Sequence, residues 1–248
     1  MGTVIFGIIF WIVIAVIAFC PLYFIFLFIV GLFVDMNKEY EHDSRFYRFL
    51  LTNSTGVAAK LIRIRVKVTG RELLPKDTRY LLVCNHRSKF DPILTWYAFG
   101  KEQLSFISKP ENFKVPVYGR IIHCCLFMAI DRENPRNAMK TVNRAADLLK
   151  RGEVNVAVYP EGKRNYGEEL LPFHGAMFKI AQKANVPIVV MTAKGTYDIQ
   201  KNFPLHRSRV ELDVLAVLPA DEVKSMKTSA IGERVAEIMN KNLRGGQQ

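Results

Sequence analysis

The chain has 248 residues, half of them hydrophobic, and 35 Lys and Arg residues outnumber 23 Asp and Glu residues to give a formal net charge of +12. This length allows one well-buried domain with an appendage. The four cysteines are too scattered for a disulfide framework, which excludes the small disulfide-stapled scaffolds. The positive charge suits an anionic partner, either lipid or nucleic acid.

The first 34 residues carry no charged side chain. A straight helix over them would be about 51 Å long, against roughly 30 Å for the hydrocarbon core of a bilayer. We therefore expect a kinked helix over residues 2–34, bent near Pro21, with Gly31 as a further flexible point. No Lys or Arg precedes the apolar run and no small residue marks a processing site, so we do not expect a cleaved secretory signal.

Residues 40–60 mix apolar and aromatic side chains with Arg45, Arg48 and Lys60, as an interfacial helix does. We favour a two-helix membrane anchor over residues 1–58, sunk in the cytoplasmic leaflet. The alternative is one transmembrane helix followed by a linker. In both arrangements the basic residues that follow favour the cytoplasmic side.

Residues 59–248 are expected to form one α/β domain, because short apolar runs alternate with helical patterns. Strands are predicted over residues 62–68, 80–84, 104–108, 124–130, 154–159, 187–193 and 210–217. Helices are predicted over residues 92–99, 136–150, 176–184 and 221–242. This order predicts a mixed, mostly parallel sheet flanked by helices.

The first predicted strand of this domain has one basic face, made of Arg63, Arg65 and Lys67. Lys and Arg commonly protect an edge strand from pairing with another sheet, and contact with lipid phosphates is the alternative. His123, Cys124 and Cys125 have no second pair at a ligand spacing, so no metal site is expected. Together with Cys20 and Cys84, these cysteines suggest reduced thiols in a cytosolic domain.

Two polar clusters follow predicted strands. In residues 85–91, His86 can act as a base, and the carboxylate of Asp91 can fix its tautomer and stabilise the imidazolium. The spacing alone is weak evidence, since Ser88 and Asp91 also fit a helix capping box. No Gly-x-Ser-x-Gly nucleophile elbow occurs, so a base without a protein nucleophile suggests that the hydroxyl of a substrate attacks.

In the second cluster, residues 159–165, Glu161, Gly162, Lys163 and Arg164 offer a tight turn with exposed N–H groups and a guanidinium that can bind a phosphate. A solvated charged turn is the alternative. Because aromatic residues are not interleaved with the basic runs, nucleic acid is not an expected partner.

These clusters resemble those of the glycerolipid acyltransferase family. Residues 85–91 match its Asn-His-x-x-x-x-Asp block, and residues 159–165 resemble its Phe-Pro-Glu-Gly-Thr-Arg-Ser block. Residues 129–132 resemble its apolar-Asp-Arg block, and residues 186–190 its Val-Pro-Ile-x-Pro-Val segment. The blocks occur in the order of the family, and the length and single anchor resemble bacterial members that acylate 1-acyl-glycerol-3-phosphate.

The chain departs from the family pattern mainly around the expected head-group site. Lys163 replaces the usual Thr, Asn165 the Ser, and Tyr159 the Phe, while Val190 falls where Pro is frequent. His174 stands where Lys is common. These differences leave the reaction type intact and bear on the choice of acceptor.

The resemblance implies that His86 is the general base and Asp91 its orienting partner. Glu161, Gly162 and Arg164 would bind the acceptor, with Arg164 on the phosphate and the Gly162 N–H as a candidate oxyanion donor. Further substrate-binding candidates are Ser88, Lys109, Arg132 and Lys163. For Lys109 and Arg132 a structural salt bridge is the alternative, and Lys163 could simply face water.

The implied reaction transfers an acyl group from acyl-CoA or acyl-acyl-carrier-protein to the sn-2 hydroxyl of lysophosphatidic acid, without metal or cofactor. Anionic membrane lipids, and acyl carrier protein where it is the donor, are the expected partners, at the cytoplasmic face of a bacterial inner membrane. Two alternatives remain open. One is acyl transfer to another lysophospholipid or an aminolipid, or from a phospholipid donor; the other is a basic lipid-binding membrane module without catalysis.

Overall fold

The structure, a computed structural model, describes residues 2–167 and 169–245. Its helices are α1 (Gly2–Leu32), α2 (Arg45–Leu61), α3 (Phe90–Ala98), α4 (Tyr118–Cys124), α5 (Pro135–Lys150), α6 (Lys179–Ala184), α7 (Ile199–Asn202), α8 (Ala220–Ser225) and α9 (Thr228–Gly245). Its strands are β1 (Ile64–Thr69), β2 (Leu81–Cys84), β3 (Leu104–Ser108), β4 (Met128–Ala129), β5 (Asn155–Val158), β6 (Ile188–Lys194) and β7 (Ser208–Leu218). Short 3-10 helices comprise Arg71–Leu73, Gly100–Glu102, Pro110–Lys114 and Gly175–Met177.

The strands form a seven-stranded sheet in the order β1-β7-β6-β2-β5-β3-β4. All neighbouring pairs are parallel except β6 and β7, which are antiparallel. The prediction of a mixed, mostly parallel sheet flanked by helices is therefore confirmed. β1 lies at one edge, where Arg65 and Lys67 are exposed, as expected for a strand that must not pair further.

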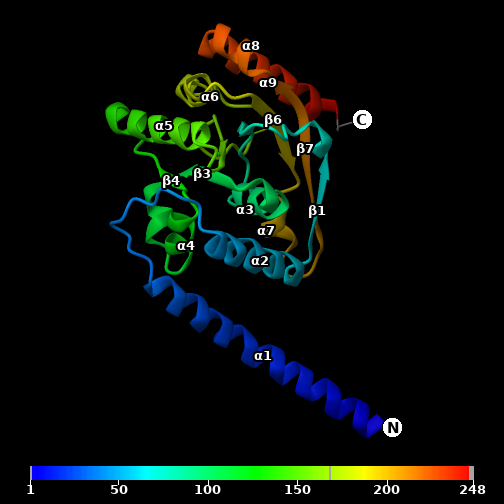
Figure 1. Ribbon diagram of the computed structural model, residues 1–248. Coiled ribbons are helices and arrows are strands. Elements are labelled where there is room, and N and C mark those ends of the chain that lie inside the picture. Colours follow the sequence, from blue (N-terminus) through cyan, green and yellow to red (C-terminus); the bar gives the residue numbers. More distant parts are fainter. Residues whose placement is uncertain (1, 168, 246–248) are drawn as a thin grey trace.

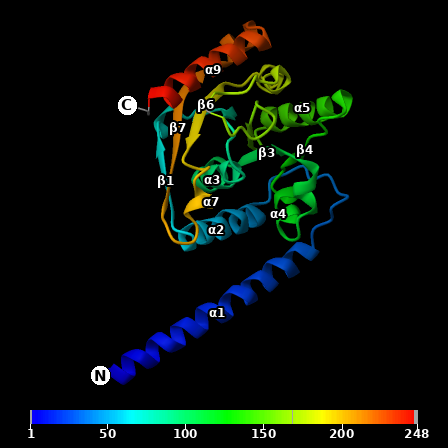
Figure 2. The same cartoon turned by 180° about the vertical axis from the view of Figure 1, so that it is seen from behind.

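Helices cover both faces of the sheet (Figures 1 and 2). α2, α3 and α4 pack on one face, and α5, α6 and α9 pack on the other. Successive residues of the central strands alternate between the two cores, so Leu82 belongs to the first and Val83 to the second. Because both faces are covered, β2 is a continuous apolar run, as are residues 156–158 of β5.

Two predicted elements differ from the structure. Residues 124–130, predicted as a strand, instead contain the end of α4 at Cys124, a turn at Leu126 with φ of 59°, and only the two paired residues of β4. The run is buried, and an apolar segment buried on all sides has no periodicity that separates helix from strand. Residues 221–242, predicted as one helix, are divided between α8 and α9 by extended backbone at Met226.

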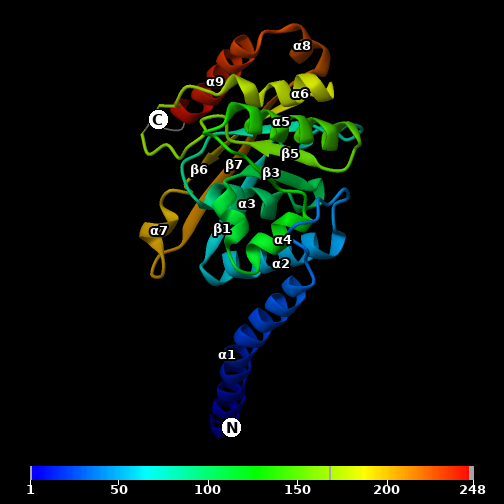
Figure 3. The ribbon, with the colours of Figure 1, turned by 90° about the vertical axis from the view of Figure 1, so that its left-hand side faces the viewer.

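α1 and α2 occupy the N-terminal region in which two helices are predicted. α1 extends away from the body (Figures 1 and 3), and it continues through Pro21 without the interruption that a sharp kink would bring. Its C-terminal half contacts α2, since the hydroxyls of Tyr23 and Ser54 are 2.9 Å apart and the Tyr47 hydroxyl donates to the Val30 carbonyl at 3.1 Å.

Over the described part of the chain, no helix combines the length and apolar character needed to cross a bilayer. The side chain of Cys20 lies outside what the structure describes. Cys84, Cys124 and Cys125 are buried free thiols.

A buried arginine joins α2 to the sheet. The Arg48 guanidinium donates to both carboxylate oxygens of Asp43, at 2.6 and 2.7 Å, and to the carbonyls of Leu104 and Cys125 at 2.8 and 3.0 Å. These bonds connect α2 to β3 and to the turn after α4. A buried guanidinium that is paired and makes four hydrogen bonds fixes the position of α2.

We expect Arg48→Ala to lower the free energy of unfolding by about 3 kcal/mol, because the buried Asp43 carboxylate loses its partner. Chemical or thermal unfolding of the purified protein measures this loss. Asp43→Ala should cost a similar amount, and the double variant less than the sum. Arg45→Ala, on the exposed side of the same helix turn, is the matched control, and equal effects at both arginines would contradict the assignment.

Candidate functional site

The two polar clusters lie side by side because the strands that precede them are parallel neighbours. β2 and β5 pair with Val83 opposite Val158, so the loops that follow leave the same edge of the sheet. We call residues 85–91 the His86 loop and residues 159–165 the Glu161 loop. The Asn165 N–H donates to the His86 carbonyl at 2.7 Å, which joins the two loops directly.

Asp91 organises the His86 loop from a fully buried position. Its Oδ2 accepts from His86 Nδ1 at 2.8 Å and from the N–H groups of Arg87 and Ser88, each at 2.7 Å. With the carboxylate as acceptor, Nδ1 is the donor, and in the neutral imidazole this leaves the lone pair of Nε2 free. The capping and orienting roles considered for Asp91 are therefore performed by one carboxylate oxygen.

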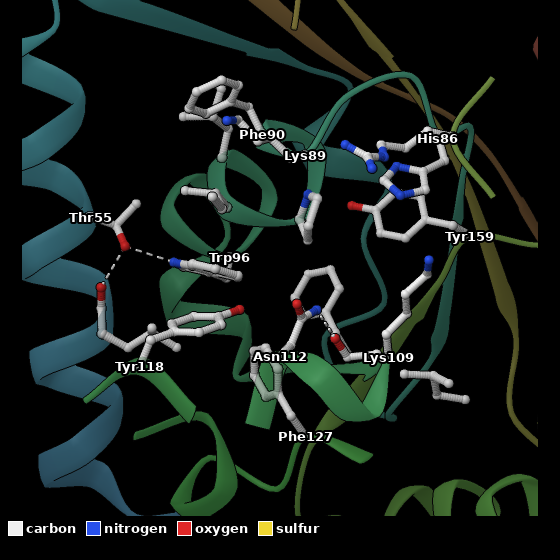
Figure 4. A pocket seen from close by; sticks show the side chains of 18 of the residues that line it. Thr55, His86, Lys89, Phe90, Trp96, Lys109, Asn112, Tyr118, Phe127 and Tyr159 are labelled. Atoms are coloured by element: carbon white, nitrogen blue, oxygen red, sulfur yellow. Dashed lines mark hydrogen bonds between the residues drawn. The ribbon is translucent and has the colours of Figure 1, made fainter. Parts of the chain in front are cut away.

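The His86 imidazole is held between Asp91 and an aromatic ring. Tyr159 stacks on it with ring centroids 4.4 Å apart and an interplanar angle of 27°, as Figure 4 shows. Burial raises the pKa of Tyr159 well above its ordinary value, so the phenol stays neutral. With 18% of its side chain exposed, His86 still reaches the cavity described below.

Asn85 and Glu161 fix the backbone on either side of the histidine. The Asn85 amide donates to the Ala193 carbonyl and accepts from the Ala193 N–H, at 3.1 and 2.8 Å, which ties the His86 loop to β6. Glu161 is 2% exposed. Its Oε1 accepts from the His86 N–H at 2.7 Å, and its Oε2 accepts from Asn165 Nδ2 and the Leu171 N–H, both at 3.0 Å.

Gly162 is required by the shape of the Glu161 loop. Its φ is +70°, and an added Cβ would lie 2.6 Å from His174 Nε2. The Gly162 N–H donates to the Tyr159 carbonyl at 3.0 Å and closes the turn. In this structure its hydrogen is used inside the loop, and the expectation that this N–H serves as an oxyanion donor stays a prediction.

A cavity of about 1090 Å³ opens beside His86. Its lining combines basic side chains with apolar ones that come from both N-terminal helices, α3, α4 and the sheet. The basic lining residues are Lys89, Lys109, Arg132, Lys163 and Arg164. The apolar lining includes Phe24, Leu27, Leu51, Ala59, Trp96, Phe106, Ile121 and Phe127. Figure 4 shows His86 and Lys109 on one side, with Trp96 and Tyr118 on the other.

The structure divides the predicted substrate-binding residues into two groups. Lys109, Arg132, Lys163 and Arg164 line the cavity together with Gly162. Among the described residues, none of these four cations lies within ion-pairing distance of a carboxylate, so the salt-bridge alternative for Lys109 and Arg132 is not seen.

Ser88 and Glu161 instead lie behind the cavity wall. The Ser88 hydroxyl accepts from the Phe90 N–H at 3.2 Å at the start of α3, and the Glu161 carboxylate is occupied by the backbone and Asn165. This placement differs from the prediction that both residues contact the substrate, because burial turns their polar atoms toward the N–H groups of the loops.

Some lining residues had no role assigned from sequence. Lys89 lies in the first motif, and His174 is noted above only as a departure from the family pattern; both line the cavity. Phe24 and Leu27 belong to α1, more than 50 residues before the first motif, and no local pattern connects them to the site.

The thiols close to the site are not nucleophiles. Burial raises the pKa of Cys84 well above its ordinary value and that of Cys125 to about 12. Both therefore remain protonated at neutral pH. In residues 2–167 and 169–245, no three His, Cys, Asp or Glu side chains are grouped as metal ligands.

Comparisons with known proteins place this geometry in context. The family model described as Acyltransferase matches residues 65–194, about half of the chain. The 1-acyl-sn-glycerol-3-phosphate acyltransferase alpha of Bos taurus is 30% identical over 181 residues, which cover 72% of this chain and 63% of that protein. The chain therefore spans slightly less than two thirds of the length of this relative.

A bacterial relative and a solved structure are also similar. The 1-acyl-sn-glycerol-3-phosphate acyltransferase of Bacillus subtilis is 28% identical over 191 residues, covering 73% of this chain and 91% of that protein. The crystal structure of the 1-acyl-sn-glycerophosphate acyltransferase PlsC from Thermotoga maritima superposes with a TM-score of 0.69 at 22% identity, covering 91% of this chain and 89% of that one. At this identity the second likeness shows the fold alone.

We expect Glu161→Gln to lower the free energy of unfolding by about 2 kcal/mol. The amide nitrogen of Gln cannot accept a hydrogen bond, so at least one of the three buried donors loses its acceptor. Thermal unfolding of the purified variant measures the loss. Lys163→Gln, in the same loop but exposed, is the control and should leave stability unchanged. A Glu161→Gln protein as stable as the wild type would show that the carboxylate does not brace the loops.

Proposed function

Because the chain belongs to the acyltransferase family, we propose that it transfers a fatty acyl group from an acyl thioester to the sn-2 hydroxyl of 1-acyl-glycerol-3-phosphate, forming phosphatidic acid. The proposal rests on one observation: His86, held by Asp91, lines a single cavity whose lining contains both basic and apolar side chains. A lysophospholipid has the same division between an anionic head and an apolar chain. The named activity of the relatives supports the same acceptor.

The proposed acceptor site follows from the charges. Arg164, which lines the cavity together with Lys109, Arg132 and Lys163, holds the phosphate of the acceptor through charge-assisted hydrogen bonds. The apolar lining then takes an acyl chain, whose burial is favourable by about 0.8 kcal/mol per CH₂. This orientation brings the free hydroxyl of the glycerol to His86.

The proposed reaction has no covalent acyl-enzyme. His86 Nε2 takes the proton of the sn-2 hydroxyl as the oxygen attacks the thioester carbonyl. The tetrahedral intermediate collapses, the C–S bond breaks, and the thiolate takes the proton from the imidazolium. The Asp91 carboxylate stabilises the imidazolium between these two proton transfers. The acyl donor is a thioester of coenzyme A or acyl carrier protein, and the proposed reaction uses no cofactor.

We further propose that α1 and α2 hold the protein on the cytoplasmic face of a membrane, which in a bacterium is the inner membrane. Support comes from the exposed apolar side chains of both helices. Phe24, Phe28 and Leu32 of α1 are about half exposed, as are Phe46 and Phe49 of α2. Such faces require an apolar environment.

We expect His86→Ala to abolish phosphatidic acid formation, and Asp91→Asn to reduce kcat at least about 10²-fold, since general base catalysis contributes 10² to 10⁴. Mass spectrometry of products from lysophosphatidic acid and each thioester carrier measures turnover. Thermal unfolding of both variants checks that the fold persists. Near-normal transfer by folded His86→Ala would exclude His86 as the base.

We expect Arg164→Ala to raise the KM for lysophosphatidic acid about tenfold or more, because a charge-assisted contact to phosphate is lost. The KM for the thioester should change much less. Steady-state kinetics with Lys150→Ala, an exposed cation outside the cavity, provides the control. If both the acceptor KM and kcat stayed at wild-type values, Arg164 would not belong to the phosphate site.

A further inference from the structure

A second exposed apolar surface lies on the segment around α7, which follows β6 in the chain. We call residues 197–207 the α7 segment. At its tip, Phe203 is 55% exposed and Leu205 is 76% exposed. Figure 3 shows α7 projecting from the side of the body at about the level of α2. Large apolar side chains held outward on a projecting segment need a partner that removes them from water.

The α7 segment is attached to the end of α2. The Arg63 guanidinium, just beyond α2, donates to the Pro204 carbonyl at 3.1 Å and to the Leu205 carbonyl. This bond brings the tip beside the last turn of α2, where Leu61 is 67% exposed. The α7 tip therefore adjoins a helix that already presents apolar side chains outward.

Basic residues belong to each of the elements that meet near this apolar tip. Lys60, Arg63, Arg65, Lys201 and Arg207 are all exposed, and they come from the end of α2, from β1 and from the α7 segment itself. Lys201 also pairs with Asp198 of the same segment at 3.9 Å. Exposed apolar side chains together with cations match the two layers of an anionic bilayer surface, with lipid phosphates above the acyl boundary. The formal net charge of +12 favours the same partner.

An aromatic pair connects the α7 segment to the cavity. Lys201 Nζ lies 4.7 Å from the centroid of the Tyr197 ring, and the Tyr197 and Tyr166 rings are 5.9 Å apart. Tyr166 lines the cavity and is 61% exposed. Tyr side chains favour the interfacial layer of a membrane, so the surface runs from the apolar tip to the residues around the cavity.

We propose that the α7 segment is a second membrane contact, which inserts Phe203 and Leu205 into the interfacial layer of an anionic bilayer while these cations contact lipid phosphates. Together with α1 and α2, this contact sets the tilt of the domain and turns the cavity toward the lipid surface. The inference rests on the proposed function, because a lysophospholipid acceptor comes from the bilayer.

A fluorophore at the tip tests this contact without using activity. The full chain carries Cys20→Ser and Leu205→Cys, labelled with an environment-sensitive nitrobenzoxadiazole group, because the native Cys84, Cys124 and Cys125 are buried. The control is the same label at Lys224→Cys on α8, which is exposed and lies at the far end of the body from α2 (Figure 1).

With vesicles of phosphatidylcholine and phosphatidylglycerol, we expect the Leu205→Cys label to gain at least about twofold in intensity, shift its emission to shorter wavelengths and be quenched by nitroxide lipids. The Lys224→Cys label should not change. A tip label that behaves like the control would overturn the proposal. So would a tip label shielded from iodide but not reached by nitroxide lipids, since a protein would then cover it. An equal response with phosphatidylcholine alone would remove the cations from the contact.

Kinetics separates this inference from the proposed function. Phe203→Ser/Leu205→Ser should match the wild type on a short-chain lysophosphatidic acid dissolved as monomers, and turn over more slowly, by about fivefold or more, when the acceptor is embedded in anionic vesicles. Equal rates in vesicles would count against the α7 contact. Absence of turnover by the wild type under both conditions would count against the acyltransferase proposal and leave the fluorescence result standing.

Discussion

A buried carboxylate at the start of α3 holds the site in its geometry. Asp91 has no exposed surface, and its Oδ2 accepts from His86 Nδ1 and from the N–H groups of Arg87 and Ser88. Removing a charge from water costs several kcal/mol, and the three donors on Oδ2 offset part of this cost. The loop therefore has little freedom to rearrange, and the same bonds that stabilise the carboxylate orient the imidazole.

A second buried carboxylate, that of Glu161, holds the loop after the neighbouring strand against the His86 loop. Glu161 accepts from the His86 N–H, while the Asn165 N–H donates back to the His86 carbonyl. The Glu161 loop thus supports the His86 loop by polar bonds and by the Tyr159 ring stacked on the imidazole. These contacts depend on the parallel pairing of β2 with β5, which ends both strands at the same edge.

The cavity combines parts that have different origins in the chain. Its basic side chains come from loops that follow strands, where polar residues are commonly exposed at the carboxyl edge of a sheet. Its apolar lining includes Phe24 and Leu27, so α1 contributes to the site as well as to the exposed apolar surface. α1 therefore lines the cavity and also faces the surroundings of the protein. Its contacts with α2 through Tyr23 and Tyr47 fix its position.

The polar clusters could be located in the sequence because each combines its residues within a short span, while their roles were implied by the family resemblance. The relation of His86 to Asp91, the turn at Gly162 and the alternation of strands and helices are local, and each follows from side-chain chemistry or periodicity. The role of Glu161, the use of the Gly162 N–H within its own turn, and the conformation of residues 124–130 depended on what lies next to them in space. Burial depends on how the whole chain packs. It directs the polar atoms of Glu161 and Ser88 inward, to N–H groups that need an acceptor. The same packing lets α1 complete a cavity that is also lined by motifs more than 50 residues later in the chain.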